Sequence, residues 1–305
     1  MDDHFIQRRL SLMLKVDDFK TSRLPTWCPG CGDFGIWVAL KNALVELSLG
    51  PSNVAFVFDI GCNSNMYDSL KVTSFEGLHG RTIPVAEGIR LVNNNLPVIC
   101  ITGDGGCLGE GGNHFIHAAR RNFDITVIIF DNAVYGLTTG QTSPTAPKNF
   151  KTKSTPEGVI EYPINPLTLA LSAEATLVAR GFSGDIVGLT SLVKEAIIHK
   201  GFSVLDILQP CVTFNHEMTF QWYKERAYYL PKTYSPTDKT EAFKKALEFP
   251  KSHISSAADE KIPLGVFYRE NRPTYEEELP QIKNTSLVNQ LIENIDVSDI
   301  IAEMS

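Results

Sequence analysis

Hydrophobic residues gather in short, almost continuous apolar runs that are separated by stretches of mixed character. The runs are NVAFVFDI at 53–60, PVICIT at 97–102, ITVIIFD at 125–131 and SVLDIL at 203–208, with ATLVARG at 175–181 as a weaker fifth. Strands that are buried on both faces of a parallel sheet have this pattern, because neither face meets water. We therefore predict a sheet that is built from these segments.

Three segments between the predicted strands carry apolar residues at helical spacing, namely residues 33–48, 109–121 and 184–199. Strands that alternate with helices are typical of a doubly wound α/β domain, with a mostly parallel sheet and helices on both faces. We expect this domain over residues 25–215. An N-terminal extension over 1–24 would precede it, and a partner-facing C-terminal extension over 216–305 would follow it.

The segment 138–165 is rich in Thr, Ser, Pro and Lys, and it shows neither the apolar pattern of a strand nor that of a helix. We predict a long loop there. A loop of this length inside a domain needs a functional reason to be ordered.

Composition and charge narrow the possible partners and compartments. Of 305 residues, 43% are hydrophobic and 21% are charged, as in an ordinary globular protein. The formal net charge of -7 argues against nucleic acid as the main partner, because proteins that bind it usually carry a basic surface. No signal peptide and no apolar run of about 18 residues is visible, so we expect a cytoplasmic protein without a membrane partner.

Cys28 and Cys31 form a C-x-x-C pair within TWCPGCGDFG, residues 26–35. In a cytoplasmic protein such a pair is more often metal-binding or catalytic than a structural disulfide. The pair alone leaves four readings open: a redox disulfide, half of a zinc site, half of an iron–sulfur site, or no function.

The other four cysteines fall into two groups. Cys62 and Cys211 each follow a predicted strand directly, in IGC and QPC, where the chain leaves the sheet. Cys100 ends the apolar run LPVIC and is more typical of a small buried apolar residue. Cys107 follows a glycine-rich turn and is ambiguous. Cys62 and Cys211 therefore differ from Cys100 and Cys107 in their place along the chain.

The predicted strand PVICIT leads directly into GDGG, residues 103–106, and a predicted helix follows. A glycine turn at such a junction lets backbone N–H groups approach a phosphate closely. Asp104 adds a carboxylate, and Asn132 follows the next strand 28 residues later. Mg²⁺ prefers such oxygen ligands and often shares them with phosphate groups. The sequence therefore predicts a site for a magnesium-bound diphosphate.

The stretch GDGGCLGEGGNHFIHAARRNFDITVIIFDNAVYGLTTGQTSPT resembles the thiamin-diphosphate motif of the 2-oxoacid:ferredoxin oxidoreductases, in particular of their β subunit. WCPGCGDFG, DIGC and LHGRTIPVAEGIRL resemble further motifs of this family, in the family's order, over about residues 25–215. The resemblance implies a thiamin-diphosphate-binding fold of the diphosphate-binding type. It also implies a β subunit that needs an α subunit, as a heterodimer or a higher assembly. Together they would convert a 2-oxoacid and coenzyme A to acyl-CoA and CO2 and pass electrons to ferredoxin.

The resemblance implies roles for individual residues. Mg²⁺ would be held by Asp104, Asn132 and the backbone oxygen of Val134, and one 4Fe–4S cluster by Cys28, Cys31, Cys62 and Cys211. The residues expected along the thiamin diphosphate are Ile60, Gly61, Cys62, Asn63, His79, Gly103, Gly105, Gly106, Gly136, Leu137 and Thr138. His79, Asn65 and Leu137 are expected near the reacting groups. The glutamate that activates thiamin would come from the α subunit.

Iron–sulfur is favoured over zinc on this reading, although an all-cysteine zinc site stays chemically possible. Structural zinc usually uses two close pairs of ligands. Here the third and fourth cysteines lie alone, 31 and 149 residues further along the chain. A cluster assembled from distant loops beside an organic cofactor suits electron transfer.

The sequence departs from the family at Asn65, three residues after Cys62, where a basic residue is common. Asparagine carries no charge, so a second substrate carboxylate is not expected to meet a cation there. GNHFIHAARRN and YGLTTGQTSPT nevertheless look most like the 2-oxoglutarate branch. We favour 2-oxoglutarate slightly, and pyruvate or a broad range of 2-oxoacids stays open.

Two other functions remain as alternatives. A non-redox thiamin-diphosphate-dependent decarboxylase or transferase subunit would use the same diphosphate site but would have no use for the four cysteines. A zinc-stapled α/β interaction module without enzymatic activity would contain zinc, no iron and no thiamin.

Overall fold

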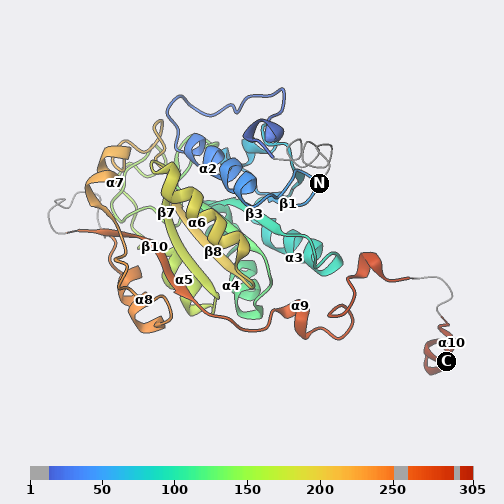
Figure 1. Ribbon diagram of the computed structural model, residues 1–305. Coiled ribbons are helices and arrows are strands. Elements are labelled where there is room, and N and C mark those ends of the chain that lie inside the picture. Colours follow the sequence, from blue (N-terminus) through green and yellow to red (C-terminus); the bar gives the residue numbers. More distant parts are fainter. Residues whose placement is uncertain (1–13, 251–259, 292–295, 305) are drawn as a thin grey trace, which may run out of the picture.

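The computed structural model describes residues 14–250, 260–291 and 296–304 (Figure 1). An eight-stranded sheet with the strand order β2-β1-β3-β4-β8-β7-β10-β9 forms its centre, and β5 and β6 make a separate two-stranded sheet. The strands are β1 Ala55–Phe58, β2 Thr73–Glu76, β3 Val98–Gly103, β4 Thr126–Asp131, β5 Val134–Tyr135, β6 Gln141–Thr142, β7 Leu177–Phe182, β8 Ser203–Leu208, β9 Ala227–Tyr229 and β10 Ile262–Arg269.

Helices connect most of these strands. They are α2 Asp33–Glu46, α3 Thr82–Val92, α4 Gly112–Arg121, α5 Pro166–Ser172, α6 Ile186–Ile198, α7 Phe220–Arg226, α8 Lys239–Ala246, α9 Tyr275–Glu278 and α10 Ser298–Glu303. The 3₁₀ turns are η1 Val16–Phe19, η2 Cys62–Met66 and η4 Leu287–Asn289, and η3 Gly105–Glu110 is a π-helix. Among the described residues, none of the helices combines the length and apolar character needed to span a bilayer.

The sheet confirms the predicted fold class. All pairings from β2 through β7 are parallel, β10 runs antiparallel beside β7, and β9 pairs with β10 in parallel. The five predicted strands correspond to β1, β3, β4, β7 and β8, and the three predicted helices to α2, to η3 with α4, and to α6. Strands β9 and β10 lie in the segment predicted as a C-terminal extension and lengthen the sheet at one edge. The division into domains otherwise stays a prediction.

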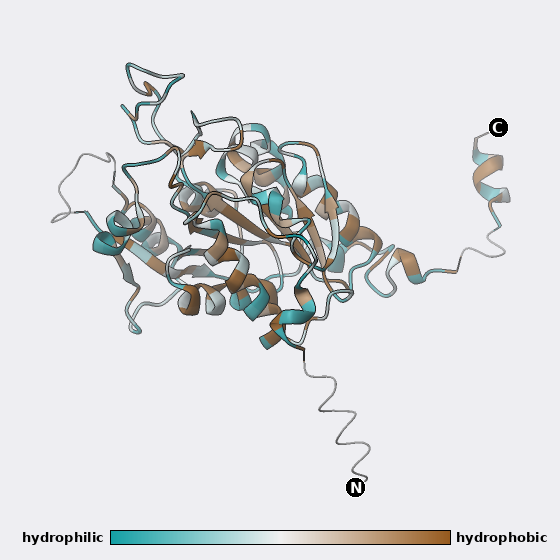
Figure 2. Cartoon of the chain, turned by 90° about the horizontal axis from the view of Figure 1, so that it is seen from above, coloured by the Kyte–Doolittle hydropathy of each residue, from teal (hydrophilic) through white to brown (hydrophobic). Residues whose placement is uncertain are grey.

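The central strands are apolar on both faces, because each face is covered by helices. Along β3, Val98 and Cys100 enter the core below α3, α4 and α5, whereas Ile99 and Ile101 enter the core below α2 and α6. Figure 1 shows α2 and α6 side by side, and Figure 2 shows the central strands in the brown of hydrophobic residues. Continuous apolar runs therefore became central strands, as expected for a parallel sheet.

The carboxyl ends of β1, β3, β4 and β8 meet at one edge of the sheet, so the loops that follow them lie together. Residues 143–165 contain neither helix nor strand, which agrees with the predicted long loop. Part of this loop folds back on itself, because the N–H of Val159 bonds to the carbonyl of Phe150 at 3.0 Å and that of Asn149 to Val159 at 2.8 Å. Residues 1–13 of the predicted N-terminal extension lie outside the described residues.

Candidate active site

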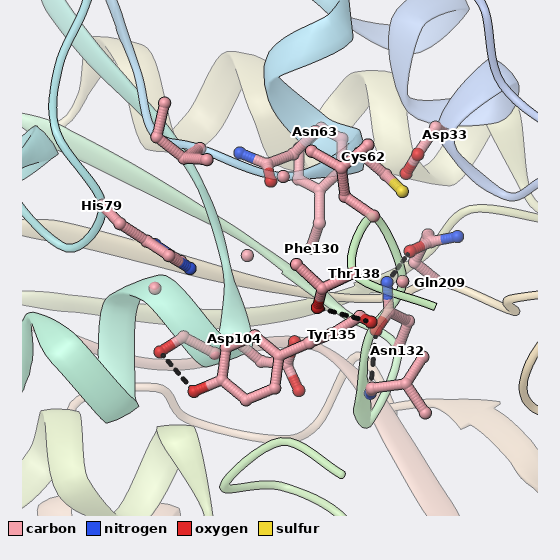
Figure 3. Close-up of a pocket in the computed structure, with 18 residues that line it drawn as sticks. Asp33, Cys62, Asn63, His79, Asp104, Phe130, Asn132, Tyr135, Thr138 and Gln209 are labelled. Atoms are coloured by element: carbon pink, nitrogen blue, oxygen red, sulfur yellow. Dashed lines mark hydrogen bonds between the residues drawn. The ribbon is translucent and has the colours of Figure 1, made fainter. Parts of the chain in front are cut away.

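A cavity lies at the carboxyl ends of the central strands, and Figure 3 shows the side chains around it. All the residues predicted along the diphosphate cofactor and the three predicted magnesium ligands line it: Ile60, Gly61, Cys62, Asn63, His79, Gly103, Asp104, Gly105, Gly106, Asn132, Val134, Gly136, Leu137 and Thr138. Four further lining residues were not predicted: Asp33, Phe130, Tyr135 and Gln209. Residues from several distant loops thus meet in what we call the cofactor cavity.

The glycines of the turn after β3 permit a very close approach of neighbouring groups. A Cβ atom on Gly106 would lie 1.7 Å from Oδ2 of Asp59, and one on Gly105 would lie 2.3 Å from Cε1 of Tyr135. No side chain fits at either position. The turn therefore presents bare backbone to the cofactor cavity, the arrangement that suits a phosphate group.

Asp104 stands at the start of this turn with its carboxyl group buried. Its Oδ2 accepts hydrogen bonds from the N–H of Ala133 at 3.2 Å and from the hydroxyl groups of Ser143 and Thr145. Burial raises the pKa of Asp104 despite these bonds, because a buried carboxylate loses its hydration. A cation in the cavity would restore the ionised form, so the site fits a hard divalent ion.

Asn132 faces the same cavity from the loop after β4. Its Oδ1 accepts from the N–H of Val134 at 3.0 Å, and its Nδ2 donates to Oε1 of Gln209 at 2.7 Å. A backbone N–H can only donate, so this contact fixes which end of the carboxamide faces the turn. The oxygen of Asn132 and the carboxylate of Asp104 both line the cavity.

His79 projects into the cavity from the loop before α3 (Figure 3). Its Nδ1 lies 3.3 Å from Oδ1 of Asp59, which is fully buried and also accepts from the N–H of Gly80 at 2.8 Å and the hydroxyl of Thr102 at 2.7 Å. The bond to Asp59 raises the pKa of His79, and Glu110, with Oε2 4.0 Å from Nε2, adds to this. Asp59 therefore orients the ring. The sequence reading missed its role, although it stands in the DIGC motif.

A second cavity of about 190 Å³ is lined by all four cysteines that were predicted to bind a cluster, Cys28, Cys31, Cys62 and Cys211. We call it the thiol cavity. A Cβ atom on Gly136 would lie 3.2 Å from Sγ of Cys62 and 3.9 Å from Sγ of Cys211, so two thiols converge there. Cys100 and Cys107 are buried and do not line it.

Burial raises the pKa of the Cys62 thiol to about 12 and also raises those of Cys31 and Cys211. Neighbouring acidic groups add to this in each case. The thiols of Cys31, Cys62 and Cys211 are therefore neutral without a metal. Within the described part of the chain, no group of three or more His, Cys, Asp or Glu side chains is arranged for a single metal ion.

The two cavities share a wall, because Cys62, Gly136 and Leu137 line both. Asp33, at the start of α2, faces the cofactor cavity beside Cys62 (Figure 3) and is 1% exposed. Neither of its carboxyl oxygens has a hydrogen-bond partner among the described residues, and burial raises its pKa to about 7. Asn65 lines the thiol cavity and not the cofactor cavity.

Comparisons with known proteins give the class of the protein. Residues 59–207 match the family described as "Thiamine pyrophosphate enzyme, C-terminal TPP binding domain". Residues 211–284 match the family of the C-terminal part of the pyruvate ferredoxin oxidoreductase beta subunit. The fold and the site thus define a thiamine-pyrophosphate-binding enzyme domain.

Relatives over most of the chain narrow this class. "2-oxoacid:ferredoxin oxidoreductase 2, subunit beta" of Aeropyrum pernix is 45% identical over 269 residues, which are 87% of each chain. "2-oxoglutarate oxidoreductase subunit KorB" of Mycobacterium tuberculosis is 45% identical over 201 residues, 66% of this chain and 54% of that one. A solved 2-oxoglutarate:ferredoxin oxidoreductase from Magnetococcus marinus matches with a TM-score of 0.87 at 33% identity, covering 96% of both chains. The chain belongs to the β subunits of the 2-oxoacid:ferredoxin oxidoreductases.

Proposed function

We propose that this chain works with an α subunit to decarboxylate a 2-oxoacid oxidatively, forming acyl-CoA and CO2, and passes the electrons through one 4Fe–4S cluster to ferredoxin. The observation that carries this proposal is the wall of Cys62, Gly136 and Leu137 between the cofactor cavity and the thiol cavity. Direct adjacency of an organic cofactor and a cluster is what electron transfer between them needs.

Thiamin diphosphate fits the cofactor cavity, with its diphosphate against Gly105 and Gly106 and Mg²⁺ on Asp104, Asn132 and the carbonyl of Val134. When bound, it supplies the electron sink for loss of CO2. The chain's own residues position the reactants around it. We expect the backbone of the turn to lie against the diphosphate, since Asp59 and Tyr135 leave no room for a side chain at Gly106 and Gly105. Three hydrogen bonds fix the carboxyl group of Asp104.

His79 holds a proton at the edge of this cavity. Its Nδ1 is bonded to Asp59, so Nε2 is the nitrogen available to exchange a proton within the cavity. Because the bond to Asp59 raises the pKa of His79, the ring stays protonated to a higher pH than a free histidine. Asp59 thereby orients His79 and sets its charge.

The thiol cavity fits a cluster held by Cys28, Cys31, Cys62 and Cys211. Metal binding needs thiolates, so loading releases protons from the neutral thiols of Cys31, Cys62 and Cys211. A partly buried site of this kind, lined also by Trp27 and Phe214, sets the potential of the cluster through burial and hydrogen bonding.

The substrate is a 2-oxoacid, and we favour 2-oxoglutarate. The KorB relatives are named for 2-oxoglutarate, and the Magnetococcus marinus structure is described as holding 2-oxoglutarate, coenzyme A and succinyl-CoA. Leu137 belongs to the shared wall and would face the substrate in the cofactor cavity, whereas Asn65 lines the thiol cavity. Because Asn65 carries no charge to bind a second carboxylate, pyruvate is proposed as a second substrate.

The α subunit is proposed to cover the mouth of the cofactor cavity. Leu78, next to His79, is 79% exposed, and Leu137, which lines the cavity, is 51% exposed. Apolar side chains around a binding site are commonly covered by a partner. The partner would also supply the glutamate that activates thiamin and the coenzyme A region.

Co-expression with the α-subunit gene under exclusion of air tests the proposal. The purified complex should be brown, contain about four iron atoms per β chain as a 4Fe–4S cluster requires, and reduce ferredoxin with a 2-oxoacid and coenzyme A. The β chain alone, prepared in the same way, is the control and should be inactive. A colourless complex that still decarboxylates would support the non-redox alternative, and zinc without iron or thiamin would support the interaction module.

A further inference from the structure

Gln209 follows β8 directly and reaches residues of both cavities with one side chain. Its Oε1 accepts from Nδ2 of Asn132 at 2.7 Å, and its Nε2 lies 3.3 Å from Sγ of Cys31. The side chain is 1% exposed and lines the cofactor cavity (Figure 3). A single carboxamide thus joins a proposed magnesium ligand to a proposed cluster ligand.

The surrounding contacts fix the direction of this carboxamide. Nε2 also donates to the carbonyl of Pro210 at 3.0 Å, and a carbonyl can only accept, so the nitrogen faces Cys31 and the oxygen faces Asn132. On the other side, Oδ1 of Asn132 accepts from the N–H of Val134. Both amides therefore have one consistent orientation, and neither can rotate without losing a bond.

The chain leaves space for this side chain. A Cβ atom on Gly32, directly after the C-x-x-C pair, would lie 2.8 Å from Cγ of Gln209. The N–H of Gly32 also bonds to the carbonyl of Pro210 at 3.2 Å. The loop that carries Cys31 thus packs directly against Gln209. This packing brings the amide N–H of Gln209 close to the sulfur of Cys31.

We propose that Gln209 is a positioning residue that couples the two cofactor sites. Its oxygen holds the carboxamide of Asn132 so that Oδ1 faces the metal, and its N–H donates to the thiolate of Cys31 and stabilises the reduced cluster. The inference rests on the proposed function. Groups behind a metal ligand set its orientation, and hydrogen bonds to cluster sulfurs set the reduction potential.

Gln209→Met tests both halves of the proposal in the complex with the α subunit, because methionine keeps the length and removes the bonds to Asn132, Cys31 and Pro210. Losing a partner behind a metal ligand typically costs roughly 10- to 100-fold in metal affinity, so the Mg²⁺ concentration needed to load thiamin diphosphate should rise by about that factor. The midpoint potential of the cluster, followed by electron paramagnetic resonance, should become more negative. Gln221→Met is the control, because that amide bonds to Glu225 on α7 and should change neither value.

An Asn132→Ala background separates positioning from general disturbance. There, Gln209→Met should no longer change the Mg²⁺ requirement, since the ligand it orients is gone, but should still lower the cluster potential. The same further loss of Mg²⁺ affinity in both backgrounds would overturn the proposal, as would an unchanged potential. Failure of both Gln209→Met and Gln209→Leu to fold would assign Gln209 a purely structural role and overturn it too. If the unaltered complex binds neither iron nor thiamin, the proposed function fails first.

Discussion

The amino ends and the carboxyl ends of the central strands differ in how their buried polar groups are satisfied. At the amino ends, Asn122 accepts at Oδ1 from the N–H of Phe202 at 2.9 Å and the hydroxyl of Thr176 at 2.7 Å. Its Nδ2 donates to the carbonyl of Pro273 at 3.0 Å. The side chain of Asn122 thereby joins the starts of β4, β7 and β8 to the segment before α9.

Ion pairs extend this satisfied network. Arg90 of α3 bonds to Asp124 and, at 3.2 Å, to Glu276 of α9, and Glu276 in turn accepts from the N–H of Asp124 at 3.2 Å. His199 bonds to the hydroxyl of Thr176 at 2.9 Å. Here buried charges have partners on neighbouring elements, which is the usual condition for burying them.

At the carboxyl ends, by contrast, not every buried polar group has a partner. Asp33 is buried, and neither of its carboxyl oxygens has a hydrogen-bond partner among the described residues. Burial raises the pKa of Asp104, and four thiols line one cavity. An unpaired buried polar group lowers stability, so the carboxyl group of Asp33 calls for an explanation. The comparison teaches that Asn122 and its partners at the amino ends bond to one another, whereas Asp33, Asp104 and the four thiols at the carboxyl ends line two cavities.

The largest effect is expected from Asn122→Ala at the amino ends. It removes four side-chain hydrogen bonds. It also places alanine, which has a Cβ atom but cannot form these bonds, at a backbone φ of 56°. We expect the free energy of unfolding to fall by about 3–5 kcal/mol in urea titrations. Asn122→Gly, which suits the left-handed backbone, should recover roughly 1 kcal/mol of this loss. A loss below 1 kcal/mol would contradict the view that this edge carries stability.

The next prediction concerns Asp104→Ala at the carboxyl ends. It removes the proposed hard ligand of Mg²⁺, so the affinity for thiamin diphosphate should fall by more than the roughly 10- to 100-fold typical of groups behind a ligand. Iron content and brown colour should persist. Calorimetric titration and iron analysis measure the two outcomes.

Cys211→Ser is the matched control for Asp104→Ala and should show the reverse. The cluster should be lost or weakened, while thiamin diphosphate still binds. Full iron content together with normal ferredoxin reduction in Cys211→Ser would contradict the assignment of the four thiols.

His199 gives the amino ends a dependence on pH. Burial lowers the pKa of His199 to about 4, and the charge of Arg269 adds to this. As the pH falls, the unfolded chain therefore binds a proton near pH 6.5, whereas the folded chain binds it only near pH 4. The free energy of unfolding consequently decreases as the pH falls from about 6.5 to 4. The difference between the protein and His199→Gln should amount to roughly 2 kcal/mol over this window. Parallel curves for the two proteins would show that His199 does not titrate differently on folding.

The last prediction concerns Asn65→Lys at the lining of the thiol cavity. If Asn65 faces the substrate, the new cation should favour 2-oxoacids with a second carboxylate over pyruvate. A charged hydrogen bond contributes roughly 1.5–3 kcal/mol, on the order of tenfold or more in the ratio of kcat/KM values. Asn65→Gln, which adds length without charge, is the control. An unchanged ratio would indicate that the α subunit sets specificity.

The sequence predicted the parts of this molecule whose signal is local. Strands β3, β4 and β8 are almost continuous apolar runs, and the turn around Asp104 carries three glycines within residues 103–106. The residues of the cofactor cavity came from the family resemblance, and they do lie together. Their individual roles stay predictions.

Elements without a local signal were missed. Strand β2 is exposed along its whole length and pairs with β1 through backbone bonds, so no apolar pattern marks it. Helix α3 contains Pro84 and Gly88, which suggest a break, yet Pro84 lies in the first turn, where proline is tolerated. Strand β10 is an apolar run in the sequence, but nothing local indicates that it lies antiparallel beside β7.

The sequence by itself determined which segments would be buried strands and which residues could supply thiolates, oxygens and bare backbone, because these properties belong to residue types and their spacing. The tertiary structure alone decided that Asp59 orients His79 and that Gln209 joins Asn132 to Cys31. The two residues bonded by Gln209 stand 77 and 178 positions away in the chain. A hydrogen bond depends on distance and direction in space, and only the packed sheet brings such positions together.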